Sequence, residues 1–269
     1  MNILAIDIGN TTCMFGYFHD KDIQCKWRLS TDQSKTDDEY TGLLTYQFSR
    51  FGIDVDEIDS VVICGVVPAM VGLMTNTIKK LSDKKINVFV IGTDIKPQIN
   101  IEIYNPNELG TDRWINALAG YMEFKCPLII VDFGTAITFD VVSQHGNYLG
   151  GLIVPGLRIA LEALNKRTAQ LPKTSFSKPP NVIGKSTVES IQSGAYYGNI
   201  HMISGLIESI KKDLSARISV AEKDIKVIAT GGDGQSLSQA IASIDVTLPD
   251  LTLRGIVLAL LHSEYAYET

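Results

Sequence analysis

Short apolar runs recur along the chain and are bounded by glycine, proline or charged turn residues. In the first part of the chain, this pattern predicts three consecutive strands at 2–7, 14–19 and 22–30. A helix is predicted at 37–50, because the three acidic residues in its first turn favour the positive end of a helix dipole.

The following segments alternate between strands and helices. Residues 61–64 fit a buried strand, Pro68 opens a helix that continues to about Leu81, and another strand is predicted at 87–91. The second half of the chain repeats this plan. Its predicted elements are a helix at 112–124, strands at 127–132, 137–142 and 147–153, a helix at 157–167, a polar loop from Leu171 to Pro180, a long helix at 186–213, a strand at 225–229, and helices near 234–243 and 251–267.

Two similar turns mark equivalent places in the two halves. Asp7-Ile8-Gly9-Asn10-Thr11 closes the first strand, and Asp132-Phe133-Gly134-Thr135-Ala136 follows the apolar run 128–131. The spacing of about 125 residues is too long for a solenoid repeat. It fits a duplicated pair of α/β domains. The alternative is one mixed α/β domain in which the second turn is a coincidence, because such short motifs arise easily by chance.

Both turns have the residue types that bind a metal-bound polyphosphate. A carboxylate at a strand end can hold a cation or its waters, and the glycine lets the backbone approach phosphate oxygens. A third glycine-rich turn, Thr230-Gly231-Gly232-Asp233-Gly234, lies between a strand and a helix, where a nucleotide can rest on backbone. The pattern predicts two half-domains that grip one nucleotide. Ordinary hairpin geometry is the alternative for each turn taken alone.

An aspartate stands next to an arginine at a predicted helix start, in Gly110-Thr111-Asp112-Arg113. Kinases need a carboxylate that takes a proton from the attacking hydroxyl, and a cation that holds an anionic substrate. An N-terminal helix cap beside a surface arginine is the simpler alternative.

Ser186 or Thr187 is predicted to cap the long helix, and the Thr187 hydroxyl could equally face a ligand. The glycines of Gly150–Gly156 are interpreted mainly as residues that let neighbouring backbone pack closely.

Composition narrows the function classes. The chain has 269 residues, a formal net charge of −6, 45% hydrophobic and 20% charged residues, which is ordinary for a soluble globular protein. The acidic balance argues against nucleic acid or an anionic membrane as the main partner. The four cysteines are widely spaced, which favours reduced thiols in the cytoplasm over a disulfide frame or a zinc site. Neither a signal peptide nor a membrane span is predicted.

Taken in order, these motifs resemble those of the type III pantothenate kinases, a family in the superfamily of acetate and sugar kinases, heat-shock chaperones and actin. The resemblance extends over nearly the whole chain and depends on the ordered set rather than on any one motif. The matching segments are 7–11, 110–113, 132–136, 150–156, 183–194 and 230–232.

The resemblance implies a fold and a reaction. The fold would be two duplicated actin-like (ribonuclease H-like) domains at 1–111 and 112–269, each a mixed sheet flanked by helices, with a nucleotide cleft between them. The reaction would be transfer of the γ-phosphoryl group of ATP to the hydroxyl of pantothenate, the first step of coenzyme A biosynthesis. Members are cytoplasmic homodimers, and pairing is expected here through the long helix after Ser186.

The resemblance also implies roles for particular residues. Asp112 would accept the proton, Arg113 would pair with the carboxylate of pantothenate, and Asp132 would bind a potassium or ammonium ion. Asp7 would bind Mg²⁺ through water. The remaining pantothenate contacts would be Gly110, Thr111 and Thr187. The ATP contacts would be Asp7, Ile8, Gly9, Asn10, Thr11, Thr12, Cys13, Met14, Thr135, Gly231 and Gly232.

Two alternatives remain within the same superfamily. One is a non-catalytic relative that serves transcription as an accessory factor, and a missing Asp112 or a strongly basic surface would favour it. The other is a different member, such as a sugar kinase or an exopolyphosphatase. The presence of Asp112 and the negative net charge favour the kinase.

Overall fold

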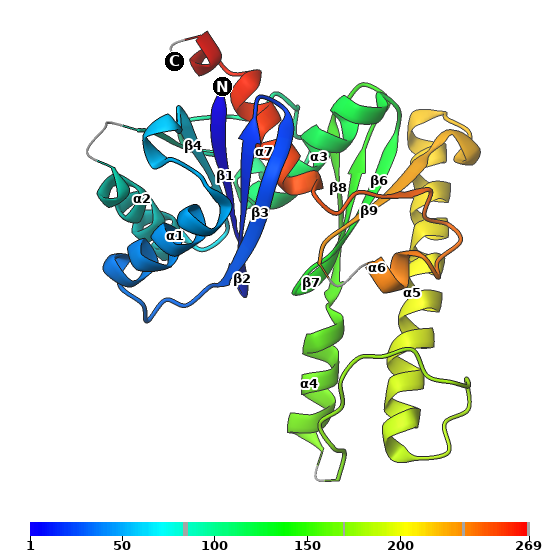
Figure 1. Cartoon of the computed structure of the whole chain (residues 1–269). Coiled ribbons are helices and arrows are strands. Elements are labelled where there is room, and N and C mark those ends of the chain that lie inside the picture. Colours follow the sequence, from blue (N-terminus) through cyan, green and yellow to red (C-terminus); the bar gives the residue numbers. More distant parts are fainter. Residues whose placement is uncertain (83–85, 169, 233–234, 268–269) are drawn as a thin grey trace. The chain divides into compact units, whose positions relative to one another are not determined.

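The computed structural model describes residues 1–82, 86–168, 170–232 and 235–267 (Figure 1). The chain divides into two compact units. Unit 1 comprises Met1–Asn100, Tyr104–Ala119 and Leu251–Thr269, and unit 2 comprises Ile101–Ile103 and Gly120–Asp250.

Unit 1 is built on a mixed sheet with the strand order β3-β2-β1-β4-β5 (Figure 1). The first three strands form an antiparallel meander, whereas β4 pairs parallel with β1, and β5 pairs parallel with β4. The strands are β1 (Asn2–Ile8), β2 (Thr12–His19), β3 (Asp22–Ser30), β4 (Ser60–Gly65) and β5 (Asn87–Val90).

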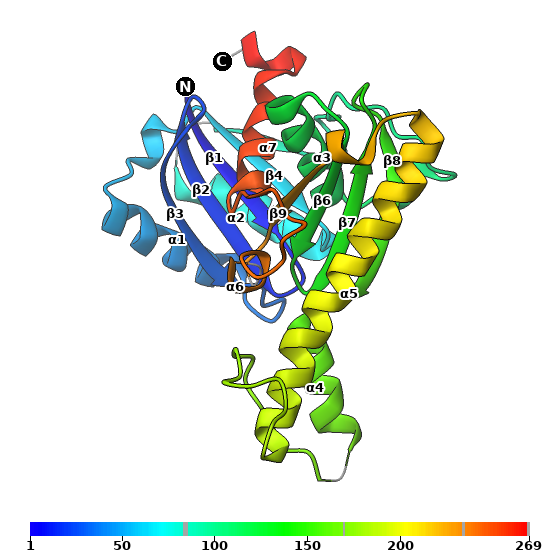
Figure 2. The ribbon, with the colours of Figure 1, turned by 90° about the vertical axis from the view of Figure 1, so that its right-hand side faces the viewer.

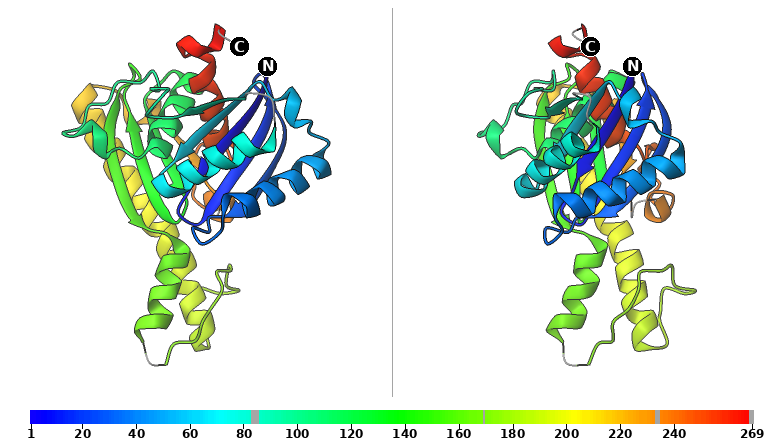
Figure 3. Two further views of the ribbon diagram at one scale, coloured as in Figure 1. Left: turned by 90° about the vertical axis from the view of Figure 1, so that its left-hand side faces the viewer. Right: turned by 60° about the vertical axis from the view of Figure 1, so that its left-hand side comes forward.

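Helices cover both faces of this sheet, so the central strand β1 is buried on both sides. α1 (Asp37–Phe51) and α2 (Pro68–Leu81) pack on one face (Figure 3). α7 (Leu251–Leu261) contacts β1, β2 and β4, and it lies close to α3 (Thr111–Phe124), because Gly255 has no side chain to keep Ile115 away.

Unit 2 contains a second mixed sheet, with the strand order β10-β9-β6-β7-β8. β6, β7 and β8 again form an antiparallel meander, and β9 and β10 continue the sheet in parallel. The strands are β6 (Leu128–Phe133), β7 (Ala136–Val142), β8 (Tyr148–Pro155), β9 (Lys226–Thr230) and β10 (Val246–Thr247).

The long helix α5 (Thr187–Ile218) packs against this sheet through Ile203, Ile207 and Ile210. Its N-terminal part extends past the end of the sheet and contacts α4 (Leu157–Arg167), as Figure 2 shows. α6 (Gln235–Ser238) is a single turn. Short 3₁₀ turns occur at Val55–Glu57, Pro106–Glu108, Glu222–Asp224 and Glu264–Tyr267.

The two sheets therefore have the same topology, a three-stranded meander followed by two parallel strands on the other side of the first strand. This repeat confirms the predicted duplicated actin-like fold. The compact units differ from a division at residue 111, because α7 follows all of unit 2 in the sequence but packs on β1 and β4.

Two local predictions were wrong, and one short strand was missed. The helix expected near 234–243 is reduced to α6, while residue 234 lies outside the described residues. β10 was not predicted, since two residues are too few to produce an alternating pattern. α7 ends at Leu261 rather than at residue 267, because the Ser263 hydroxyl bonds the Leu260 carbonyl and ends the regular turns.

Candidate active site

The β1–β2 hairpin contains the first predicted phosphate-binding segment, Asp7–Met14. Asp7 is half-buried at the end of β1 and lies beside Cys64 of β4 in the parallel register. The Gly9 amide donates to the Thr12 carbonyl oxygen at 3.0 Å, and a Cβ at Gly9 would lie only 3.2 Å from that oxygen. The two residues at the tip of the turn are exposed. A half-buried carboxylate thus stands beside an exposed, tightly folded turn.

The segment Gly110–Arg113 forms the start of α3. The Asp112 Oδ1 atom accepts the Arg113 amide at 2.8 Å, and a Cβ at Gly110 would lie 2.5 Å from that oxygen, so Gly110 leaves room for the carboxylate. The Thr111 hydroxyl donates to the Gly65 carbonyl at 3.2 Å. Burial raises the pKa of Asp112 above its usual value, and hydrogen bonding and charge at Arg113 oppose the rise.

Cys64 lies within the electrostatic reach of both Asp7 and Asp112. Its thiol is fully buried at the end of β4, and burial raises its pKa well above the usual value. The charges of Asp7 and Asp112 raise that pKa further, while a hydrogen bond with Thr111 lowers it. The structure therefore brings together two aspartates that the sequence placed in separate motifs.

Unit 2 carries the second Asp-x-Gly turn at the end of β6. Asp132 is half-buried and Thr135 is exposed. The Gly134 amide donates to the Ala136 carbonyl at 3.1 Å, and the turn is one residue shorter than that of the first hairpin. The two turns are therefore similar in position but not identical in geometry.

Two glycines pack closely against this second turn. Gly231 follows β9 with a φ of +94°, and a Cβ there would overlap the Asp132 carboxylate and lie 2.6 Å from the Phe133 amide nitrogen. A Cβ at Gly156 would overlap the Thr135 carbonyl oxygen. Only glycine permits these approaches. For Gly156, this supports the packing role that was predicted for the glycines of 150–156.

A cavity of about 1010 Å³ opens beside Gly232 in unit 2. Sequence reasoning identified Gly232 but missed the other residues of this cavity, because they come from α4, the loop after Leu171 and the residue that follows α6. Those residues are Leu157, Arg158, Leu161, Glu162, Asn165, Lys166, Lys173, Thr174, Ser175, Phe176 and Gln239. Three of the four charged side chains in this set are cationic, which favours an anionic or electron-rich ligand.

Thr187 is the first residue of α5 and is exposed. Ser186 is the N-terminal cap, since its hydroxyl accepts the Glu189 amide at 3.2 Å. α5 begins in the part that extends past the end of the sheet (Figure 1), and Thr187 is its first residue.

The carboxylates of Asp7 and Asp132 fit hard cations that take only one or two ligands from the protein. In the described ranges, no group of three or more His, Cys, Asp or Glu side chains is placed to hold a metal. Mg²⁺ at a nucleotide needs only one or two carboxylates, because water and phosphate fill its other positions. Asp7 can supply such a carboxylate, and Asp132 offers one beside the carbonyl groups of its glycine turn. No helix within the described segments is long and apolar enough to cross a membrane.

Solved structures share this fold across the whole chain. A conserved protein from Campylobacter jejuni, described as a candidate transcriptional activator of the Baf family, is 19% identical with a TM-score of 0.58, and 96% of each chain is covered. A candidate N-acetylmannosamine kinase from Listeria monocytogenes is 11% identical with a TM-score of 0.50, and the match covers 97% of this chain and 99% of that one. Identities this low show the fold alone.

The two sheets of identical topology, each with an Asp-x-Gly turn, place the chain in the class of actin-like folds. Within that class, a sequence model of the type III pantothenate kinases matches residues 3–209. The chain belongs to the type III pantothenate kinase family, a family of phosphotransferases.

Proposed function

We propose that this protein phosphorylates pantothenate with ATP and forms 4′-phosphopantothenate, the first intermediate on the route to coenzyme A. Family membership supports this reaction class. The observation that carries the proposal is the arrangement at the start of α3, where a half-buried carboxylate with a raised pKa precedes an arginine and acts, together with Asp7, on the buried Cys64 thiol.

Asp112 is proposed to accept the proton of the pantothenate hydroxyl while the hydroxyl oxygen attacks the γ-phosphorus of ATP. The bond to the β–γ bridging oxygen breaks, and ADP leaves with the electron pair. Burial raises the pKa of Asp112, which makes it a stronger base than an exposed carboxylate. Arg113 would bind the carboxylate of pantothenate, and Gly110, Thr111 and Thr187 would make further contacts.

The ATP contacts are proposed for each unit separately. In unit 1, the turn Asp7–Met14 would hold phosphate oxygens, and Asp7 would bind Mg²⁺ through water. A Mg²⁺ ion held there would offset the charge that develops on the phosphate oxygens. In unit 2, Thr135, Gly231 and Gly232 would contact ATP, and the cavity beside Gly232 is large enough for a nucleoside.

A homodimer is proposed through the helical part of unit 2 that includes the start of α5. The loop that leads into α5 exposes apolar side chains, since Ile183 and Val182 keep 83% and 62% of their surface accessible. A monomeric mass from light scattering of the full chain would contradict this pairing.

Asp132 is expected to make activity depend on a monovalent cation. Potassium or ammonium should support turnover, whereas sodium at the same ionic strength should not, because the larger cations suit an open carboxylate and carbonyl site. Replacing Asp132 with Ala should remove the activity together with its cation dependence. Initial rates in the three salts test this for both proteins, and equal wild-type rates in sodium and potassium would contradict the cation site.

The reaction itself is tested by ADP release with ATP, Mg²⁺ and potassium, with and without pantothenate. Release that requires pantothenate, together with phosphopantothenate detected by mass spectrometry, is the expected result. Release without pantothenate would indicate an ATPase or phosphatase. Bound nucleotide without release would favour the non-catalytic alternative.

A further inference from the structure

We propose that Thr31 is a positioning residue that aims the backbone of the turn Gly9–Thr12 at the phosphates of the nucleotide. The inference rests on the proposed function, since it assigns that turn to ATP. Thr31 stands just after β3, outside every motif that the sequence indicated.

Thr31 contacts the turn at three points. Its hydroxyl donates to the Gly9 carbonyl oxygen at 2.7 Å, and its amide donates to the Thr11 carbonyl oxygen at 3.0 Å. Its Oγ1 atom also lies 3.4 Å from the Cys13 sulfur, where β2 begins. A single half-buried residue therefore holds the first and third residues of the turn and contacts the strand that follows it.

These contacts set the direction of the amide groups. The Gly9 carbonyl and the Asn10 amide belong to one planar trans peptide and point in opposite directions. Because the Gly9 carbonyl is drawn to Thr31, the Asn10 amide faces away from Thr31. The same reasoning applies to the Thr11 carbonyl and the next amide. Backbone amides aimed in this way form an anion-binding turn without further side chains.

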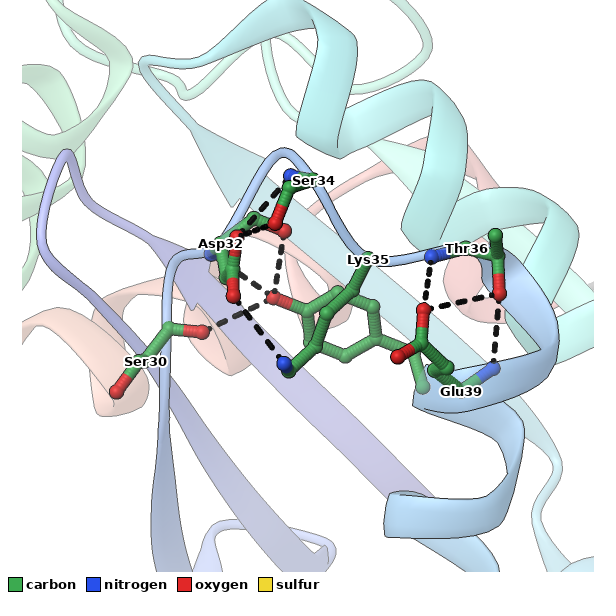
Figure 4. Close-up of polar contacts among 7 residues, drawn as sticks. Ser30, Asp32, Ser34, Lys35, Thr36 and Glu39 are labelled. Atoms are coloured by element: carbon green, nitrogen blue, oxygen red, sulfur yellow. Dashed lines mark hydrogen bonds and ion pairs between the residues drawn. The ribbon is translucent and has the colours of Figure 1, made fainter.

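The segment that carries Thr31 is itself fixed to helix α1 (Figure 4). The buried Tyr40 hydroxyl of α1 donates to the Ser30 carbonyl at 3.0 Å and accepts the Asp32 amide at 3.0 Å. Thr31 is thus held on both sides by a side chain from the core of unit 1. A residue placed this firmly can orient a neighbouring turn.

Polar contacts stabilise the rest of this segment before α1 begins (Figure 4). Asp32 accepts the Ser34 hydroxyl at 2.6 Å and the Ser34 amide at 3.0 Å and pairs with Lys35 at 3.1 Å, and these contacts lower the pKa of Asp32 to about 2. Thr36 and Glu39 then form a reciprocal capping box at the start of α1. Residues 30–39 are therefore ordered by their own contacts.

The test compares Thr31→Val with Thr31→Ser in the full-length protein. Valine keeps the shape but removes the hydroxyl, so the Kd for Mg·ADP and the KM for ATP should rise about three- to tenfold, the equivalent of one net hydrogen bond. The KM for pantothenate should stay unchanged. Serine keeps the hydroxyl and should restore both values to within about twofold of the wild type.

A purely structural role would lower the melting temperature without a selective change in nucleotide affinity. Thr41→Val is the matched control, because its hydroxyl bonds the Asp37 carbonyl within α1 at 2.8 Å. Tyr40→Phe gives a second route if Thr31→Val folds poorly, since it loosens the segment and should weaken Mg·ADP in the same direction.

Calorimetric binding of Mg·ADP separates this proposal from the proposed reaction. One outcome to distinguish is a wild type that binds Mg·ADP without phosphorylating pantothenate. If Thr31→Val then weakened Mg·ADP binding selectively, the positioning role would stand and only pantothenate as the substrate would be rejected. Unchanged Mg·ADP affinity in Thr31→Val and Tyr40→Phe would overturn the positioning role, as would a wild type that binds no nucleotide.

Discussion

Replacing Asp112 with Asn is expected to lower kcat by about 10²–10⁴-fold, the usual contribution of a general base. The amide keeps the shape of the side chain but cannot take the proton of the attacking hydroxyl. ATP affinity should stay near that of the wild type, because the ATP contacts are assigned to other residues. Steady-state kinetics with calorimetric ATP binding provide the measurement. Glu123→Gln, an exposed change in the same helix, should leave kcat unaltered.

The pH dependence of the wild type should report the same group. Because burial raises the pKa of Asp112, kcat/KM should begin to fall at a higher pH than an ordinary carboxylate would cause, as the solution is acidified. The same rise in pKa affects folding stability in the opposite direction: acidification lowers kcat/KM but favours the folded state. Burial penalises the carboxylate above its folded-state pKa, and this penalty disappears as the pH falls below that value.

It follows that Asp112→Asn should not melt earlier than the wild type at neutral pH. A loss of turnover with an unchanged or raised melting temperature would separate a catalytic defect from unfolding. An unimpaired kcat in the variant would remove Asp112 from the proposed mechanism.

Replacing Gly231 with Ala is expected to have the largest effect on stability. The new methyl group would meet the Asp132 carboxylate and the Phe133 backbone, and a φ of +94° disfavours any side chain. Strain and overlap together should lower the free energy of unfolding by roughly 2–4 kcal/mol. Mg·ADP affinity should fall as well, because the turn at Asp132 must shift.

The neighbouring glycine provides the control for stability. A Cβ at Gly232 would meet no atom within 4 Å, so Gly232→Ala should unfold at nearly the wild-type denaturant concentration. Urea unfolding of the three proteins, followed by circular dichroism, measures the difference. Equal midpoints for the two alanine variants would show that the backbone beside Asp132 tolerates a side chain.

The strands and the two Asp-x-Gly turns were predictable because their signals are local. An apolar run that ends in Asp-x-Gly specifies both a buried strand and the turn that follows it. The proximity of Asp7 and Asp112 was not predictable in this way. It depends on the parallel pairing of β1 with β4 and on the hydrogen bond from Thr111 to Gly65, and both contacts join segments far apart in the sequence.

Thr31 could have been found with one further step. A meander of three strands places the end of the third beside the start of the second, and the structure pairs Ser30 with Thr12. A hydroxyl directly after the third strand is therefore expected near the first turn. The cavity beside Gly232 offers no comparable signal, since its walls combine α4, the residue after α6 and a loop without regular structure.

The position of α7 affects the order in which the chain can fold during synthesis. This helix covers β1, β2 and β4 with buried Leu253, Ile256 and Leu260, yet the ribosome makes it only after all of unit 2. Unit 1 therefore has an uncovered apolar sheet face throughout most of translation. Unit 2, which is nearly continuous in sequence, has its core residues available first. For a chain that emerges from its N-terminus, the second half can thus be complete before the first, the reverse of the usual order for successive domains.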